Sequence, residues 1–125
     1  MLGVVDAAQA IADLTEISPQ VQRVVVVGAD GSLVGSNADP ASAQKLVDGA
    51  RRLLAAAEEL RPGVSQLEAA TVTGSVFVVR DGGRLIAATT SPEPTVGLVF
   101  YDLKTCVRSI EESKPKKKKV DDAAA

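Results

Sequence analysis

The sequence predicts one α/β domain in which helices cover both faces of an antiparallel sheet. Two hairpins predict the sheet: residues 23–37 (RVVVVGADGSLVGSN) and residues 75–90 (SVFVVRDGGRLIAATT) each place an Asp-Gly turn between two apolar runs. Asp-Gly favours a hairpin because glycine accepts the positive φ that tight turns require. The apolar runs are nearly continuous, whereas a sheet with one wet face alternates polar and apolar residues. We therefore expect helices on both faces and no room for an open cleft.

The first helix is expected over about residues 2–17, before the first hairpin. Its apolar residues recur at the spacing of one helix face: Val4, Ala7, Ala8, Ile11 and Leu14. Ser18-Pro19 ends it, because the residue before a proline is disfavoured in the α region.

The second helix is expected from Pro40 to about Glu59, with Asn37 or Asp39 as its cap. Its apolar and small residues cover about half of the helical wheel: Leu46, Val47, Gly49, Ala50, Leu53, Leu54, Ala56, Ala57 and Leu60. Packing on one sheet needs a stripe of only ~100°. The surplus indicates a second packing partner, most simply another copy of the same helix. A helix sunk deeply into its own core is the alternative.

A third strand is expected over residues 64–72, where Gln66 and Glu68 interrupt the apolar run. Charge in a short strand favours an edge of the sheet. The last helix is expected to begin near Thr95, after Pro94, and its narrow apolar stripe includes Cys106. The resulting order is helix, two strands, helix, three strands, helix.

Composition argues against catalysis and against cofactor or metal binding. The chain has no histidine and one cysteine, which removes the commonest general base, the commonest metal ligand and any zinc site built on cysteines. Gly28, Gly31 and Gly35 have the wrong spacing for a dinucleotide fingerprint, and a strand follows them where a helix is needed. We expect no enzyme activity, no cofactor and no metal.

Basic charge is concentrated in residues 114–119 (KPKKKK), and we expect the domain to span 1–113 and a disordered tail to span 114–125. The rest of the chain is acidic, which argues against nucleic-acid binding. The tail solubilises the chain, touches an acidic protein or anionic membrane, or serves as a basic nuclear-import signal. The sequence predicts no signal peptide and no transmembrane segment, and a cytoplasmic location.

The element order and two phrases, VQRVVVVGADGSLVGSN and GLVFYDLKTCVRSIEE, resemble the Roadblock dynein-light-chain family over about residues 4–112. The resemblance implies a profilin-like three-layer α-β-α sandwich with a five-stranded antiparallel sheet. It also implies homodimers, or heterodimers with a Roadblock paralogue, made by joining sheet edges and pairing second helices. Family dimers serve as platforms for Ras-like small GTPases, and some bacterial members activate polarity or gliding GTPases.

The resemblance also places candidate residues on the two expected surfaces. Those expected at the dimer contact come from the second helix and third strand: Ala43, Leu46, Val47, Ala50, Leu54, Ala57, Gln66, Glu68 and Ala70. Those expected to touch a GTPase are charged residues of the second helix: Lys45, Asp48, Arg51, Arg52 and Glu59. The alternative for the charged set is a solvated helix face in which Asp48 and Arg52 pair at i,i+4.

The sequence leaves three candidate functions. The first is a non-catalytic homodimeric regulator or scaffold for a Ras-like small GTPase. The second is a structural adaptor in a larger complex, with no dependence on nucleotide. The third is a small-molecule sensor, which would need polar groups in the core that the strands hardly offer.

Overall fold

The computed structural model describes residues 6–110 of the chain. These residues form α1 (Ala7–Ile17), β1 (Val21–Val27), β2 (Leu33–Ser36), α2 (Pro40–Leu60), β3 (Gln66–Thr71), β4 (Gly74–Asp81), β5 (Arg84–Thr90) and α3 (Val96–Ser109). The order is the predicted one, and the sheet has the strand order β2-β1-β5-β4-β3 with every pair antiparallel. The short β2 and the longer β3 are its two edges.

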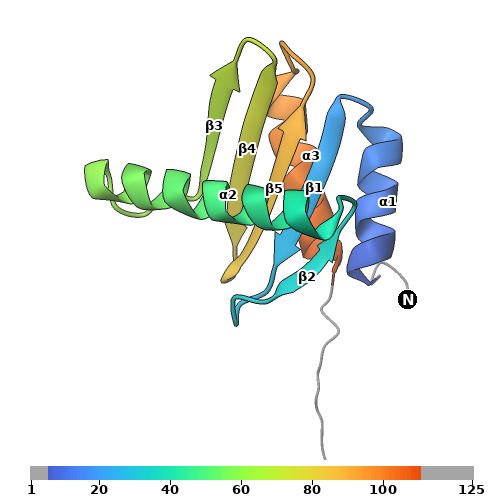
Figure 1. Ribbon diagram of the computed structural model, residues 1–125, viewed down its shortest axis with the longest axis horizontal. Helices are drawn as coiled ribbons and strands as arrows, with labels where there is room; N and C mark the ends of the chain where they lie inside the picture. The colour runs from blue at the N-terminus through green and yellow to red at the C-terminus, as the bar shows by residue number, and fades with distance from the viewer. Residues whose placement is uncertain (1–5, 111–125) are drawn as a thin grey trace, which may run out of the picture.

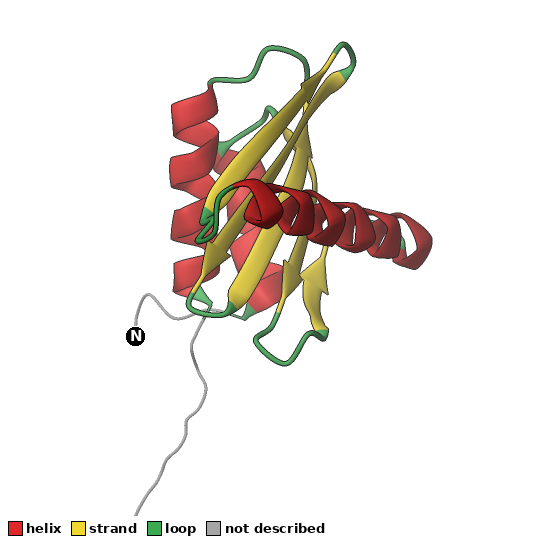
Figure 2. Cartoon of the chain, turned by 90° about the vertical axis from the view of Figure 1, so that its left-hand side faces the viewer, coloured by secondary structure: helices red, strands yellow, loops and turns green. Residues whose placement is uncertain are grey.

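Helices cover both faces of the sheet, as the continuous apolar runs predicted (Figures 1 and 2). Helix α2 crosses one face at a steep angle to the strands, while α1 and α3 lie on the other face. The run of valines in β1 divides between the two cores: Val24 and Val26 pack with α1 and α3, and Val25 and Val27 pack with α2. All four are buried. The three-layer α-β-α sandwich is therefore confirmed.

Several predicted boundaries shift by a few residues. Asp6 caps α1 by accepting a hydrogen bond from the Gln9 N–H, and within the helix Ala10 is buried whereas Ala8 is exposed. The packed face of α1 is therefore rotated slightly from the predicted one, toward α3. The third strand begins at Gln66, two residues later than expected. Residues 2–5 of the expected first helix, the domain boundary after residue 113 and the tail lie outside the described residues.

Asn37 joins β1 to the end of β2 through its side chain. Its Oδ1 accepts a hydrogen bond from the Val24 N–H at 2.7 Å, and its Nδ2 donates to the Gln22 carbonyl at 2.9 Å. The side chain thus continues the ladder beyond Ser36, where the β2 backbone turns toward α2. The cap of α2 is Asp39, which accepts from the Ser42 N–H.

Glycine at position 74 lets β3 return as β4 close to the end of β5. Its φ is +149°, and a Cβ built there would lie 2.1 Å from the Thr90 carbonyl oxygen. A side chain is excluded on both grounds. After this turn, β3 lies at the edge of the sheet, and α2 extends past it (Figure 1).

Candidate functional surface

Helix α2 runs from above β1, across β5 and β4, to a point beyond β3 (Figure 1). At 1.5 Å per residue its 21 residues span about 32 Å, which exceeds the combined width of the strands that it crosses. Glu58 anchors the far end: its carboxylate accepts hydrogen bonds from the Gly63 and Val64 N–H groups and from the Arg80 guanidinium. These donors also lower the pKa of Glu58, led by the Gly63 N–H. The end of α2 is therefore tied to β4 and to the loop before β3.

The face of α2 opposite the sheet carries most of the charged residues expected to touch a GTPase. Asp48, Arg52 and Glu59 are exposed and lie on this side of the helix, while Lys45 is exposed but turns its side chain toward the sheet. Arg51 lies elsewhere: its guanidinium donates to the Gly31 carbonyl at 3.0 Å and holds the β1–β2 turn. The alternative Asp48–Arg52 pair does not form among the described residues, since Asp48 instead accepts from the Gln44 amide.

The helix residues expected at a dimer contact divide into two groups. Four of them, Ala43, Val47, Ala50 and Leu54, are buried against the sheet of their own chain. Within one chain they are core residues, and their expected place at a dimer contact stays a prediction. Leu46 and Ala57 remain half-exposed on the flank of the helix.

The same flank holds two leucines that the expectation left out. Leu53 is half-buried and Leu60 is 81% exposed. With Leu46 they recur every seven residues, so they form one stripe along the helix. Helical spacing in the sequence could have placed both residues on this flank, but only the structure separates the flank from the buried face.

The edge strand β3 lies next to this stripe and, within the described part of the chain, pairs only with β4. Gln66, Glu68 and Ala70 alternate with Leu67 and Ala69, and the partners of the first set in β4 face α1 and α3. Glu68 accepts a hydrogen bond from the Ser75 hydroxyl across the strand pair. The predicted edge position of the charged strand is confirmed.

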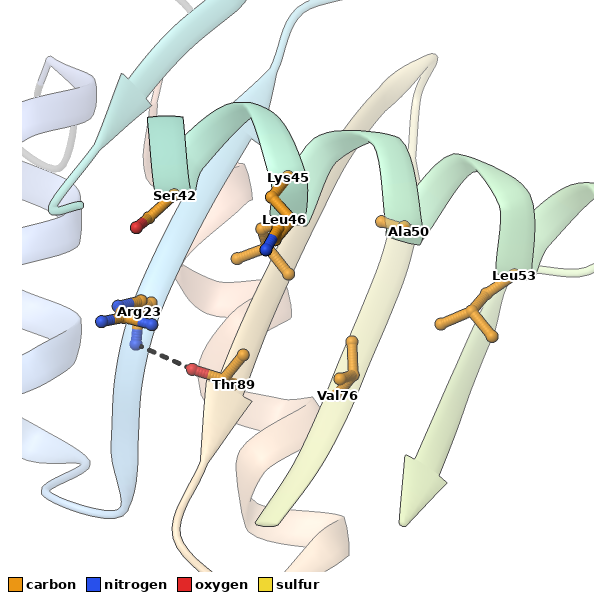
Figure 3. Close-up of a pocket in the computed structure, with 9 residues that line it drawn as sticks. Arg23, Ser42, Lys45, Leu46, Ala50, Leu53, Val76 and Thr89 are labelled. Carbon is orange, nitrogen blue, oxygen red and sulfur yellow. Dashed lines mark hydrogen bonds between the residues drawn. The ribbon is translucent and has the colours of Figure 1, made fainter. Parts of the chain in front are cut away.

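A groove of about 350 Å³ opens between the flank of α2 and the sheet (Figure 3). The expectation of no cleft is therefore wrong at this place. Ser42, Lys45, Leu46 and Leu53 descend from the helix, while Arg23, Thr89 and Val76 rise from β1, β5 and β4. Gly49 and Ala50 complete the lining. The small side of α2 at Gly49 and Ala50 leaves space between the helix and the sheet.

The groove is basic at one end and apolar at the other. Arg23 and Lys45 lie at the end over β1, and neither makes an ion pair within residues 6–110. The Arg23 N–H donates to the Thr89 hydroxyl at 3.2 Å, which joins β1 to β5 at the floor. Hydrogen bonds from the side chain and backbone of Ser42 lower the pKa of nearby Asp39, and Arg23 adds a smaller lowering. An acidic group attached to an apolar side chain would match this lining.

Reactive chemistry is scarce in the described part of the chain. Burial raises the pKa of the Cys106 thiol to about 12, with Asp13 adding to the effect, and the thiol donates to the Ala10 carbonyl. Such a thiol is not a nucleophile near neutral pH. Within residues 6–110 no His, Cys, Asp and Glu side chains gather in a group that could hold a metal ion. Nor does this region contain a helix with the length and apolar character needed to cross a bilayer.

Comparison with solved structures identifies the architecture. A Roadblock/LC7 domain from Streptomyces avermitilis superposes with a TM-score of 0.71 at 20% identity, covering 84% of this chain and 94% of that one. The chain has the Roadblock/LC7 fold. The gliding protein MglB from Thermus thermophilus matches with a TM-score of 0.64 at 12% identity, covering 88% and 89% of the two chains. A profilin, LokiProfilin1 solved with rabbit actin, matches with a TM-score of 0.55 at 14% identity over 80% and 90%.

The resemblance read from the sequence is confirmed for the fold, including its likeness to profilin. No protein-family model matches the sequence, and no curated protein matches it. Function must therefore be argued from the surfaces that this Roadblock/LC7 fold presents.

Proposed function

We propose that two copies of this chain join through β3 and α2, and that the dimer is a non-catalytic platform that binds and regulates a Ras-like small GTPase. One observation carries the proposal: a sheet edge that residues 6–110 leave unpaired lies beside a helix flank whose leucines the same residues cover only in part. Exposed edges and exposed apolar stripes are normally covered by a partner. The resemblance to the Roadblock family supplies the partner's class.

An antiparallel pair of α2 helices would place the end of one helix beside the start of the other. The stripe of Leu46, Leu53 and Leu60 would then meet its own copy, with Leu60 entering the partner's groove. Glu59 would approach the basic end of that groove, where Lys45 and Arg23 lie. Charge and apolar character agree with this arrangement, and joined β3 strands would remove one open edge from each sheet.

The outward face of the paired helices is the proposed contact for the GTPase. Asp48 and Arg52 are exposed there, and Lys45 and Glu59 border it at the proposed helix–helix contact. Apart from the Gln44–Asp48 bond, none of the four makes a side-chain bond within residues 6–110. The dimer would act by reorganising the GTPase's own switch loops, without supplying a catalytic residue. We place this activity in the cytoplasm, in a domain of residues 1–113.

A pull-down from extract of the source cells tests the proposal. Immobilised protein is incubated with extract loaded with GDP or with a non-hydrolysable GTP analogue. We expect preferential retention of a Ras-like protein with the GTP analogue. Retention of other subunits only, or retention without nucleotide preference, would favour the structural adaptor instead.

Matched variants locate the contact. Arg52→Glu changes an exposed residue on the outward face, while Lys104→Glu makes the same type of charge reversal on α3. We expect Arg52→Glu to lower GTPase retention and Lys104→Glu to leave it unchanged, with the same oligomeric mass for both. Equal retention by both variants would exclude the outward face of α2 as the contact.

A further inference from the structure

A second cleft, of about 150 Å³, lies between α1 and α3 on the opposite side of the sheet from the groove. Leu14 and Ile17 of α1 form part of its apolar wall, and Ser109 lies at the end of α3. Two carboxylates, Asp13 and Asp102, also line it. The cleft is thus an apolar slot with negative charge, and it shares no residue with the surfaces described above.

Asp102 is unusual among the acidic residues of the described region. It is only 7% exposed, and no hydrogen bond or ion pair within residues 6–110 reaches its side chain. By contrast, Asp13 at the rim is exposed and accepts a hydrogen bond from the Gln9 amide. Its oxygens are not among the fully enclosed unpartnered atoms of the described residues, so the carboxylate opens into the cleft, where a cationic ligand can reach it.

The ligand that fits is a lysine side chain. Its ammonium supplies three donors to the two carboxylates, and its four methylenes suit walls made of Leu14 and Ile17. A divalent cation fits poorly, because the cleft offers two carboxylates and mostly apolar surface.

We propose that the lysines of residues 114–119 of the same chain occupy this cleft, with one ammonium between Asp13 and Asp102. Five of the chain's fourteen basic residues lie in this segment, which comes soon after α3 in the sequence. Ser109 lines the cleft, and Lys114 comes five residues later. Five residues can span up to ~17 Å, whereas Ser109 and Asp102 are separated by about 10 Å along the helix.

The consequence is competition for the lysines. Because the cleft and the lysines belong to the same chain, the lysines meet the cleft at a high effective concentration. The cleft would therefore compete successfully with weakly acidic surfaces for the basic segment. A strongly anionic surface would withdraw the lysines and leave Asp102 unpaired. The proposal does not depend on the proposed dimer or on the GTPase.

Amide chemical shifts test the proposal in the full-length chain. We compare the ¹⁵N–¹H spectrum of the natural chain with that of a variant in which Lys114, Lys116, Lys117, Lys118 and Lys119 are all glutamine. We expect shift changes clustered at Asp13, Ile17, Asp102 and Thr105. These changes should be unaffected by tenfold dilution and should largely disappear at 1 M salt, where the screening length is ~3 Å. Changes confined to α2, or none in α1 and α3, would overturn the proposal, and dilution dependence would exclude the same chain as the source.

Three aspartate variants complete the test. In Asp102→Asn, and to a lesser extent in Asp13→Asn, replacing the lysines should no longer shift the cleft amides. Asp13 is exposed, so Asp13→Asn keeps the test valid even where Asp102→Asn weakens the fold. Asp48→Asn on α2 removes the same charge from a distant surface and should leave the lysine-dependent shifts intact. An equal loss in all three variants would indicate general electrostatics and contradict a defined site.

Discussion

Asn37 offers the sharpest test of how the sheet is held together, because one side chain closes the ladder between β1 and β2. Asn37→Ala removes both of its side-chain hydrogen bonds to β1 and keeps the one that the Asn37 N–H donates to the Val24 carbonyl. The Val24 N–H belongs to a fully buried residue, and an unpaired buried donor costs ~1–3 kcal/mol. The more exposed bond to Gln22 adds about 0.5–1.5 kcal/mol. We therefore expect a loss of roughly 2–4 kcal/mol in the free energy of unfolding.

Urea unfolding followed by circular dichroism measures this loss at one fixed protein concentration, since self-association shifts apparent stability. A domain of this size should also lose ~4 °C of Tm per kcal/mol. Asn37→Asp is the matched control: it keeps an acceptor for the Val24 N–H and loses the donor to Gln22, so it should lose about 1 kcal/mol. A loss below ~0.5 kcal/mol in Asn37→Ala, or equal losses in both variants, would refute the reasoning.

Three further variants test the local chemistry of the fold by the same unfolding assay. Gly74→Ala should lose at least ~1–3 kcal/mol from backbone strain alone, with the clash against Thr90 added, and an unchanged midpoint would contradict the turn geometry. Ser18→Ala should match or exceed natural stability by up to ~1 kcal/mol, because the buried Ser18 hydroxyl has no hydrogen-bond partner in the described structure. Glu58→Gln should be less stable than the natural chain at pH 7, and the difference should narrow below pH 4.5. The pKa of Glu58 is lowered in the folded chain, so its ionised carboxylate stabilises the fold and protonation at low pH removes that stabilisation. A difference that stayed constant from pH 7 to pH 3 would exclude the carboxylate as its source.

The secondary structure could be predicted because each element carries a local signal. The Asp-Gly turns, the proline at the start of α2 and the continuous valine runs act within a few residues of chain. Even the edge position of β3 could be predicted, because Glu68 interrupts an apolar run. The two buried faces of the sheet follow from the same pattern.

The surfaces were harder to predict, because they depend on how far two elements stand apart. The wheel of α2 indicated too many apolar residues but not which of them its own sheet would cover, so Ala50 and Leu54 were expected at a surface and lie in the core. The groove joins Arg23 to Ser42 and Thr89, residues from three elements whose meeting no local pattern specifies. Asn37 was expected only as a candidate helix cap, and its pairing with β1 depends on tertiary contact.

The molecular mass in solution tests the central claim, that two copies form the platform. Sedimentation equilibrium of the natural chain should give twice the mass of one chain at micromolar concentration. Leu60→Glu should give a folded monomer, since Leu60 is 81% exposed within one chain, while Leu98→Glu at a 49% exposed site on α3 should remain a dimer. A natural chain that is monomeric at high micromolar concentration, or a Leu60→Glu variant that still forms dimers, would contradict the account.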